Sequence, residues 1–188
     1  MKTLFKPFVL SFSAACLALL PACSASDDEN GDPTVTDDKS EETIASALGT
    51  LPEMTTLNSA ISSAGLGSIF DGPGSYTVLA PNDEAFRALG DNGAALLEES
   101  QRPLLVGILR NHMLPGHLTP EDIGAAIDAQ GGEVTMTTLG EGTVTFSREG
   151  GAVTVKNESG ATALLASNST AATNGVIVPL DTILTPAK

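Results

Sequence analysis

The stretch YTVLAPNDEAF, residues 76–86, places a strand, a turn and the start of a helix in direct succession. Residues 76–80 are β-branched or apolar, which predicts a short buried strand. Pro81 ends that strand, and Asn82 is a favourable N-cap for a helix whose first turn carries two carboxylates. We expect Phe86, on this helix, to pack back against the strand.

Apolar periodicity predicts further elements on both sides of this stretch. Residues 43–51, 53–66 and 102–113 repeat apolar positions at helical spacing, and Thr119 fits the N-cap of another helix. From Gly131 onward, apolar residues alternate with polar ones or run together between turns, which is typical of strands. Helices first and strands last predict an α+β domain with an antiparallel sheet. The predicted strands cover residues 133–139, 143–147, 152–156, 162–167 and 176–184.

Two more segments stand out beside the first stretch: LRNHMLPG at residues 109–116 and ATNGVIVPLDTIL at residues 172–184. In their order and separation, the three segments resemble the conserved boxes of the fasciclin domain family. The resemblance covers about residues 42–186. It implies a wedge of antiparallel strands wrapped by several α-helices, an adhesion role outside the cytoplasm, and no cofactor. The residues that match the boxes are Thr77, Pro81, Asn82, Phe86, His112, Gly116, Asn174, Gly175 and Asp181.

The chain departs from the family pattern at several positions. Asn111 stands where the pattern has Tyr, and Val178 stands where it has His. Pro179 lacks a backbone N–H, so we expect the last strand to be an edge or to bulge there. The family's integrin-contact sequence in animals would fall at residues 167–171, which here carry no acid. Integrin binding is therefore not implied.

Residues 1–22 have the three parts of a lipoprotein signal peptide. Lys2 and Lys6 precede an apolar run over residues 8–20, which is too short to span a bilayer permanently. The run leads to Leu-Pro-Ala-Cys, which is similar to the bacterial lipobox, and Cys23 would receive the lipid. An ordinary leader, cleaved near Ala25, is the alternative. We expect an exported protein held in the cell envelope, at the outer membrane or cell surface.

Residues 23–41 are predicted to form an acidic, flexible tether. Eight carboxylates lie between Ser24 and Glu42, against one cation, Lys39. Such a segment buries too little apolar surface to fold, and like charges extend it. The spacing of the acids fits no EF-hand loop, which weakens a calcium-binding interpretation.

The composition limits the classes of partner. The chain has a net charge of −14 at pH 7 and no cluster of Lys or Arg, which argues against nucleic acid and against electrostatic docking on anionic lipid. Contact with a membrane would come through the lipid anchor alone. We expect the partner to be a protein or polysaccharide of the envelope or matrix, or a second copy of the chain.

No set of residues typical of catalysis or metal binding is present in the sequence. His112 and His117 are the only histidines, and the interpretation we favour for His112 is a hydrogen-bonded structural residue. Two histidines without a nearby Cys make a poor zinc site. No nucleophile elbow, P-loop or dinucleotide fingerprint occurs, so we expect no enzymatic activity. The alternative is a small-ligand carrier or hydrolase of the envelope with a cleft near His112.

Residues 162–173 are uncharged and rich in Ser, Thr, Asn and Ala. On an acidic protein, a neutral surface can approach other acidic envelope components without repulsion. We therefore predict a binding surface at Asn168, Ser169 and Thr170. A buried strand followed by a plain loop is the alternative for this segment.

Overall fold

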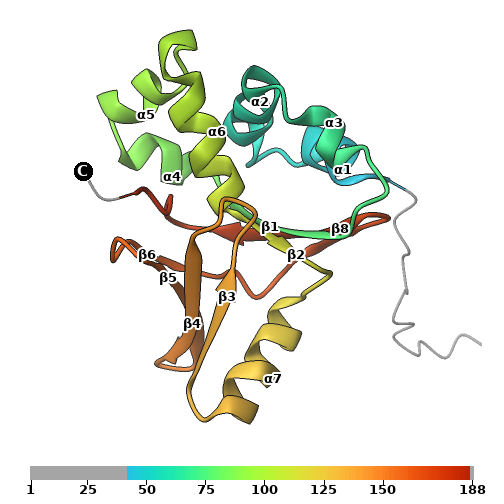
Figure 1. Cartoon of the computed structure of the whole chain (residues 1–188), viewed down its shortest axis with the longest axis vertical. Coiled ribbons are helices and arrows are strands. Elements are labelled where there is room, and N and C mark those ends of the chain that lie inside the picture. Colours follow the sequence, from blue (N-terminus) through green and yellow to red (C-terminus); the bar gives the residue numbers. More distant parts are fainter. Residues whose placement is uncertain (1–41, 187–188) are drawn as a thin grey trace, which may run out of the picture. The chain divides into compact units, whose positions relative to one another are not determined.

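The computed structural model describes residues 42–186, which form two four-stranded sheets and a group of helices (Figure 1). The helices are α1 Ile44–Thr50, α2 Thr55–Ala64, α3 Gly67–Phe70, α4 Asp83–Ala88, α5 Asp91–Leu96, the 3-10 helix η1 Glu99–Gln101, α6 Arg102–Asn111 and α7 Pro120–Gln130. The strands are β1 Tyr76–Pro81, β2 Met113–Pro115, β3 Glu133–Thr137, β4 Thr143–Glu149, β5 Ala152–Asn157, β6 Thr162–Leu164, β7 Thr170–Ala172 and β8 Gly175–Leu180. The predicted α+β class is confirmed.

The first sheet has the strand order β2-β1-β8-β7 and is mixed. Strand β1 pairs with β8 in parallel, in a register from Tyr76 opposite Gly175 to Pro81 opposite Leu180. The outer pairs, β1 with β2 and β7 with β8, are antiparallel. The expectation of antiparallel strands is wrong for the central pair of this sheet. Parallel strands need a long connection, and here the connection contains most of the domain.

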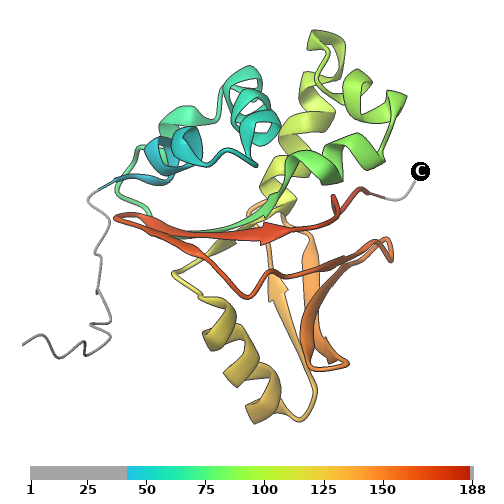
Figure 2. The ribbon, with the colours of Figure 1, turned by 180° about the vertical axis from the view of Figure 1, so that it is seen from behind.

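This first sheet separates two apolar cores, because successive side chains of a strand point to opposite faces. Val78 and Ile177 face the helices and pack with α1, α2 and α6, whereas Leu79 and Val178 face the second sheet. Figures 1 and 2 show helices α1 to α6 on one side of this sheet and the second sheet with α7 on the other.

The second sheet is an antiparallel meander in the order β3-β4-β5-β6. Val144 and Phe146 of β4 and Val155 of β5 are buried beneath it, and α7 packs against β3 and β4. Backbone contacts join the two sheets at both sides: Leu165, just beyond β6, bridges Leu180 at the end of β8, and the Leu139 amide, beyond β3, donates to the Met113 carbonyl of β2 at 2.9 Å.

Several predicted elements end earlier than expected. The predicted helix over residues 102–113 stops at Asn111, because Met113 begins β2. The predicted strand over residues 162–167 is shorter, and β7 forms separately after a bend at Ser167. The last strand ends at Leu180 instead of residue 184.

Pro179 lies inside β8 without interrupting its pairing with β1. The Pro179 carbonyl accepts a hydrogen bond from the Ala166 amide at 3.0 Å. In a strand, the N–H and C=O of one residue point to the same side, so the missing Pro179 donor also points away from β1. The paired part of β7 reaches only as far as Ile177, so no ladder bond is lost. The expectation of an edge or a bulge at Pro179 is therefore wrong: β8 is an inner strand, its register with β1 is unbroken, and residues 165–166 lie beside it on the other side.

Candidate interaction surface

Thr77 joins β1 to the turn that follows β2. Its side chain is fully buried, and its hydroxyl donates to the Gly116 carbonyl at 2.8 Å and accepts from the Leu118 amide at 2.9 Å. Gly116 has a φ of 97°, a backbone conformation that residues with a side chain rarely adopt. Thr77 and Gly116 therefore set the path of the chain from β2 toward α7.

Asn82 caps α4, as predicted: its side-chain oxygen accepts from the Ala85 amide at 2.8 Å. The neighbouring Asp83 accepts from the Thr55 hydroxyl and the Thr56 amide, which ties α4 to the start of α2. Burial by itself would raise the pKa of Asp83, but these hydrogen bonds outweigh it and hold the pKa below its usual value. Pro81 and Phe86 are buried on either side of this cap.

His112 is buried between α6 and the C-terminal segment. Its Nδ1 lies 2.8 Å from the Ile108 carbonyl, and its Nε2 accepts from the Leu184 amide at 3.0 Å. Burial lowers the pKa of His112 to about 4, against the opposing effect of the Ile108 carbonyl. Both ring nitrogens are occupied by backbone groups, so the neutral imidazole fastens the C-terminal segment and has no free nitrogen for a ligand. His117 is exposed.

Asn174 and Gly175 lie where β8 begins and hold this end of the strand against the start of α1 and the end of α3. The Asn174 side chain accepts from the Ile44 amide at 2.8 Å and donates to the carbonyls of Phe70 and Gly72. The tight turn itself consists of Thr173 and Asn174, and Gly175 is the first residue of β8. A Cβ on Gly175 would lie 1.9 Å from a backbone oxygen of β1, so only glycine fits.

Asp181 links the end of β8 to the edge of the second sheet. Its carboxylate accepts from the Leu164 amide at 2.8 Å, and its own amide lies 3.4 Å from the Leu164 carbonyl. Together with the bridge between Leu165 and Leu180, this contact positions the chain that leaves β6.

The predicted binding residues lie just beyond this link. Asn168 and Ser169 are exposed, whereas Thr170 is half-buried because it begins β7 and pairs with Ile177. Neither the side chains nor the backbone groups of Ser167, Asn168 and Ser169 form a hydrogen bond with any residue of the described part. They leave donors and acceptors open to a partner.

Leu164 adds an apolar contact to these polar residues. It is 41% exposed, and only one other large apolar side chain among residues 42–186 is as accessible. A hollow of about 550 Å3 lies beside it, between the start of α7, the β4–β5 turn and residues 164–168. We call residues 164–169 the neutral surface. Sequence patterning could not single out Leu164, because it stands within a continuous apolar run.

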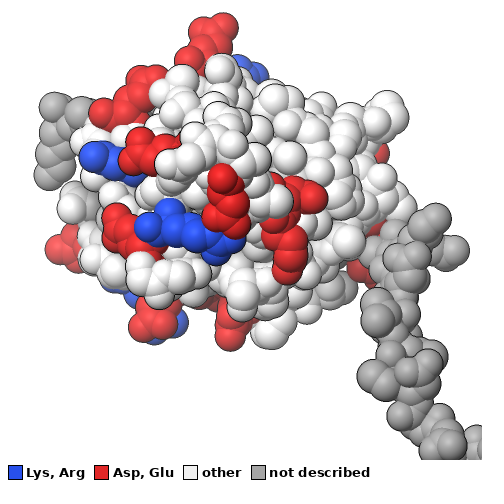
Figure 3. Space-filling view, turned by 90° about the horizontal axis from the view of Figure 1, so that it is seen from below, with Lys and Arg blue, Asp and Glu red and all other residues white. Residues whose placement is uncertain are grey.

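Charged side chains border the hollow without filling it. Arg148 lines it and is held by Asp128 of α7 at 3.1 Å, and Glu121 also lines it. In the view from below, acidic and basic side chains gather over one part of the surface and leave a broad area without charge (Figure 3). The arrangement suits hydrogen bonding and apolar contact better than charge pairing.

Cys23, the predicted signal peptide and the predicted acidic tether lie outside the described residues. Within residues 42–186, no helix is long and apolar enough to cross a membrane. The same part of the chain contains no group of three or more His, Cys, Asp or Glu side chains that could hold a metal ion.

A family model described as the Fasciclin domain matches residues 52–186. The match extends over well more than half of the chain, so the chain belongs to the fasciclin domain family. Fasciclin domains are adhesion-type modules, generally without enzymatic activity, and they occur in extracellular or secreted proteins.

The chain is similar to proteins from distant organisms. It is 30% identical over 140 residues to the pig (Sus scrofa) transforming growth factor-beta-induced protein ig-h3, a match that covers 70% of this chain and 17% of that protein. It is 35% identical over 133 residues to protein sll1483 of Synechocystis, covering 70% and 66% of the two chains. Among solved structures, a FAS1 domain pair from the insect cell adhesion molecule Fasciclin I has the same fold, with a TM-score of 0.67 and 15% identity over 78% of this chain and 52% of that one.

Proposed function

We propose that this protein is a lipid-anchored adhesion module of the cell envelope that binds its partner through the neutral surface. The observation that carries the proposal is the combination of an exposed leucine, unpaired polar groups at residues 167–169 and an adjacent hollow. A partner with apolar and hydrogen-bonding groups could cover residues 164–169, none of which is charged, and this favours binding. A protein or polysaccharide of the envelope or matrix, or a second copy of the chain, has this chemistry.

The N-terminal pattern supports the proposed anchoring and export. The signal-like residues 1–22, the lipobox cysteine and the acidic stretch that follows would place the domain outside the membrane at the end of a tether. The adhesion-type family agrees with such a location. A carrier or hydrolase with a cleft at His112 is less well supported, because both nitrogens of that imidazole are hydrogen-bonded to backbone groups.

Adding positive charge to the neutral surface tests its role. We expect the double variant Asn168→Lys/Ser169→Lys to lose surface adhesion or partner capture, because two ammonium groups would have to be desolvated on binding. Both side chains are exposed and make no internal hydrogen bond in the described part, so the melting temperature should change little. Adhesion of cells and capture from envelope and matrix extracts would be measured with the full chain.

The control is Ser59→Lys/Ser63→Lys, which adds the same charge to exposed positions of α2 on the helical side of the first sheet. This control should adhere like the parent chain. If the variant of the neutral surface also adheres like the parent, the partner binds elsewhere.

A further inference from the structure

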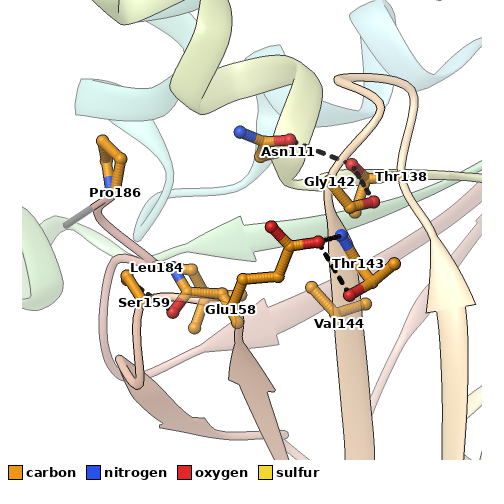
Figure 4. A pocket seen from close by; sticks show the side chains of 10 residues that line it. Asn111, Thr138, Gly142, Thr143, Val144, Glu158, Ser159, Leu184 and Pro186 are labelled. Atoms are coloured by element: carbon orange, nitrogen blue, oxygen red, sulfur yellow. Dashed lines mark hydrogen bonds between the residues drawn. The ribbon is translucent and has the colours of Figure 1, made fainter.

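A second, smaller hollow of about 230 Å3 lies where the end of α6, the β3–β4 turn, the β5–β6 turn and the C-terminal segment meet (Figure 4). It is separate from the neutral surface and shares no lining residue with the hollow there. Among the residues that line it are Asn111, Thr138, Thr143, Glu158, Leu184 and Pro186.

Internal hydrogen bonds fix the two main polar side chains of this hollow. The Thr138 hydroxyl shares its one proton between the Asn111 Oδ1 and the Gly142 carbonyl, both at 3.0 Å. The Glu158 Oε1 accepts from the Thr143 amide at 2.8 Å and from the Thr143 hydroxyl at 2.9 Å. Each side chain is held by one of its terminal atoms, which leaves the other atom available.

The opposite wall is held as well. The Asn157 side chain and the Ser159 hydroxyl both donate to the Thr185 carbonyl, at 2.8 and 2.7 Å. These bonds fix the C-terminal segment that brings Leu184 and Pro186 to the hollow. A ligand would therefore meet groups that are already in place, and little conformational entropy would be lost on binding.

The available atoms are a donor and an acceptor on side chains that line the same hollow. Asn111 Nδ2 carries two N–H groups, and Glu158 Oε2 is an anionic acceptor; neither forms a hydrogen bond within the described part of the chain. Figure 4 shows the free oxygen of Glu158 turned toward Asn111. Two neighbouring hydroxyl groups complement this pair, because one can donate to the carboxylate while the other accepts from the amide.

We propose that this hollow binds one ring of a neutral polyhydroxy compound, such as a single sugar unit. Its volume lies below the range of about 300–1,000 Å3 typical of sites for drug-sized ligands, so it suits one ring. The exposed Pro186 offers an apolar contact to the C–H groups of the ring. A cation is less favoured, because Glu158 supplies the only carboxylate in the lining and Ca²⁺ takes about six to eight oxygen ligands.

Two isosteric variants each replace the free terminal atom of a side chain and keep the atom that is hydrogen-bonded within the domain. Asn111→Asp keeps the oxygen that accepts from Thr138 and replaces the free donor with an acceptor. Glu158→Gln keeps the oxygen that accepts from Thr143 and replaces the free acceptor with a donor. Each should weaken sugar binding about tenfold or more while leaving the melting temperature close to that of the parent. Asn92→Asp and Glu133→Gln, at exposed positions away from both hollows, are the charge-matched controls.

Binding would be measured by titrating the isotopically labelled full chain, in detergent, with methyl glucoside, galactoside and mannoside. The readout is the NMR signal of the Asn111 side-chain amide and of the Thr143 backbone amide. The double variant Asn111→Asp/Glu158→Gln exchanges donor and acceptor, and we expect it to recover sugar binding, because a pair of hydroxyl groups can reverse its roles. The recovery would be followed at Thr143.

Methylammonium serves as the competing probe. A cation site would bind methylammonium, bind it more tightly in Asn111→Asp and fail to bind it in Glu158→Gln. If these three results are found and the sugars have no effect, the proposal is wrong. Absence of any response to the three glycosides at high millimolar concentration would also overturn it. The outcome is independent of adhesion through the neutral surface, because the substitutions lie in a different hollow.

Discussion

His112 is a titratable side chain that is almost completely buried in the core. The neutral ring connects the last turn of α6 to the amide of Leu184, so protonation would remove the acceptor at Nε2 and place a charge in the core. Because burial lowers its pKa to about 4 from 6.5, the unfolded chain takes up a proton at a higher pH than the folded chain does.

The stability of the domain should therefore depend on pH through His112. The contribution of the neutral ring is complete above pH 6.5 and is lost as the pH falls toward about 4. In this window, the free energy of unfolding should fall by about 1.4 kcal/mol per pH unit. Urea unfolding at a series of pH values checks this slope. His112→Asn should be less stable by about 1–3 kcal/mol at neutral pH, because buried backbone groups lose partners, and its slope should be absent.

The exposed His117 provides the control, and His117→Asn should keep the loss of stability that the buried His112 causes between pH 6.5 and about 4. A parent protein with the same stability across the whole window would contradict the assigned environment of His112.

Single residues differ in how far their surroundings follow from the sequence. The cap at Asn82 could be predicted, because it depends on neighbours within the next few residues. The role of Asp181 could not, since its partner Leu164 is brought to it only by the bridge between the sheets. The free atoms of Asn111 and Glu158 were missed for the same reason, because they come from separate turns.

Elements with a recognisable pattern in their own sequence were predicted, whereas very short strands and the direction of strand pairing were not. Helix α7 begins at the predicted N-cap and has a complete capping box between Thr119 and Asp122. Strands β2 and β7, of three residues each, have too few positions to show a period. The parallel pairing of β1 with β8 joins residues about one hundred positions apart, and no local pattern encodes the direction of such a pair.

The edge strand β6 should depend on Asp181. In Asp181→Ala, the Leu164 amide loses its acceptor, so we expect its hydrogen exchange to become faster than in the parent. The loss of global stability should be small, about 1 kcal/mol, because both residues are exposed. Exchange would be measured by NMR. Thr182→Ala, an exposed neighbour without a side-chain hydrogen bond in the described part, should leave the Leu164 amide unchanged; equal exchange rates in the two variants would contradict the link.

At the scale of the whole molecule, the first residues of the described domain lie beside the turn between β7 and β8. The Glu42 carbonyl accepts from the Thr173 amide at 2.9 Å, and the next turn of chain is held by Asn174. The segment from Cys23 would therefore join the domain at the β7–β8 turn. The neutral surface lies at the other end of β7, so residue 42 itself does not lie on the surface proposed for binding.

The anchor is tested by removing the predicted lipid acceptor. We expect Cys23→Ser to appear in the soluble fraction or to accumulate unprocessed, because the thiol that would carry the lipid is gone. Membrane fractionation and the mass of the mature chain are the measurements. Cys16→Ser, within the predicted signal peptide, should remain at the membrane like the parent. Normal cleavage with unchanged membrane association of Cys23→Ser would show that Cys23 is not the anchor.

The parallel pair of β1 and β8 also determines when the domain can fold. Neither apolar core can close until β8, which lies between β1 and β7, is in place, so the domain must wait for a strand about one hundred positions after β1 before it can fold. The delay would be useful for an exported protein, as proposed here, if it crosses the membrane before it folds. The domain would then stay unfolded until β8 has crossed the membrane, and it would fold on the far side.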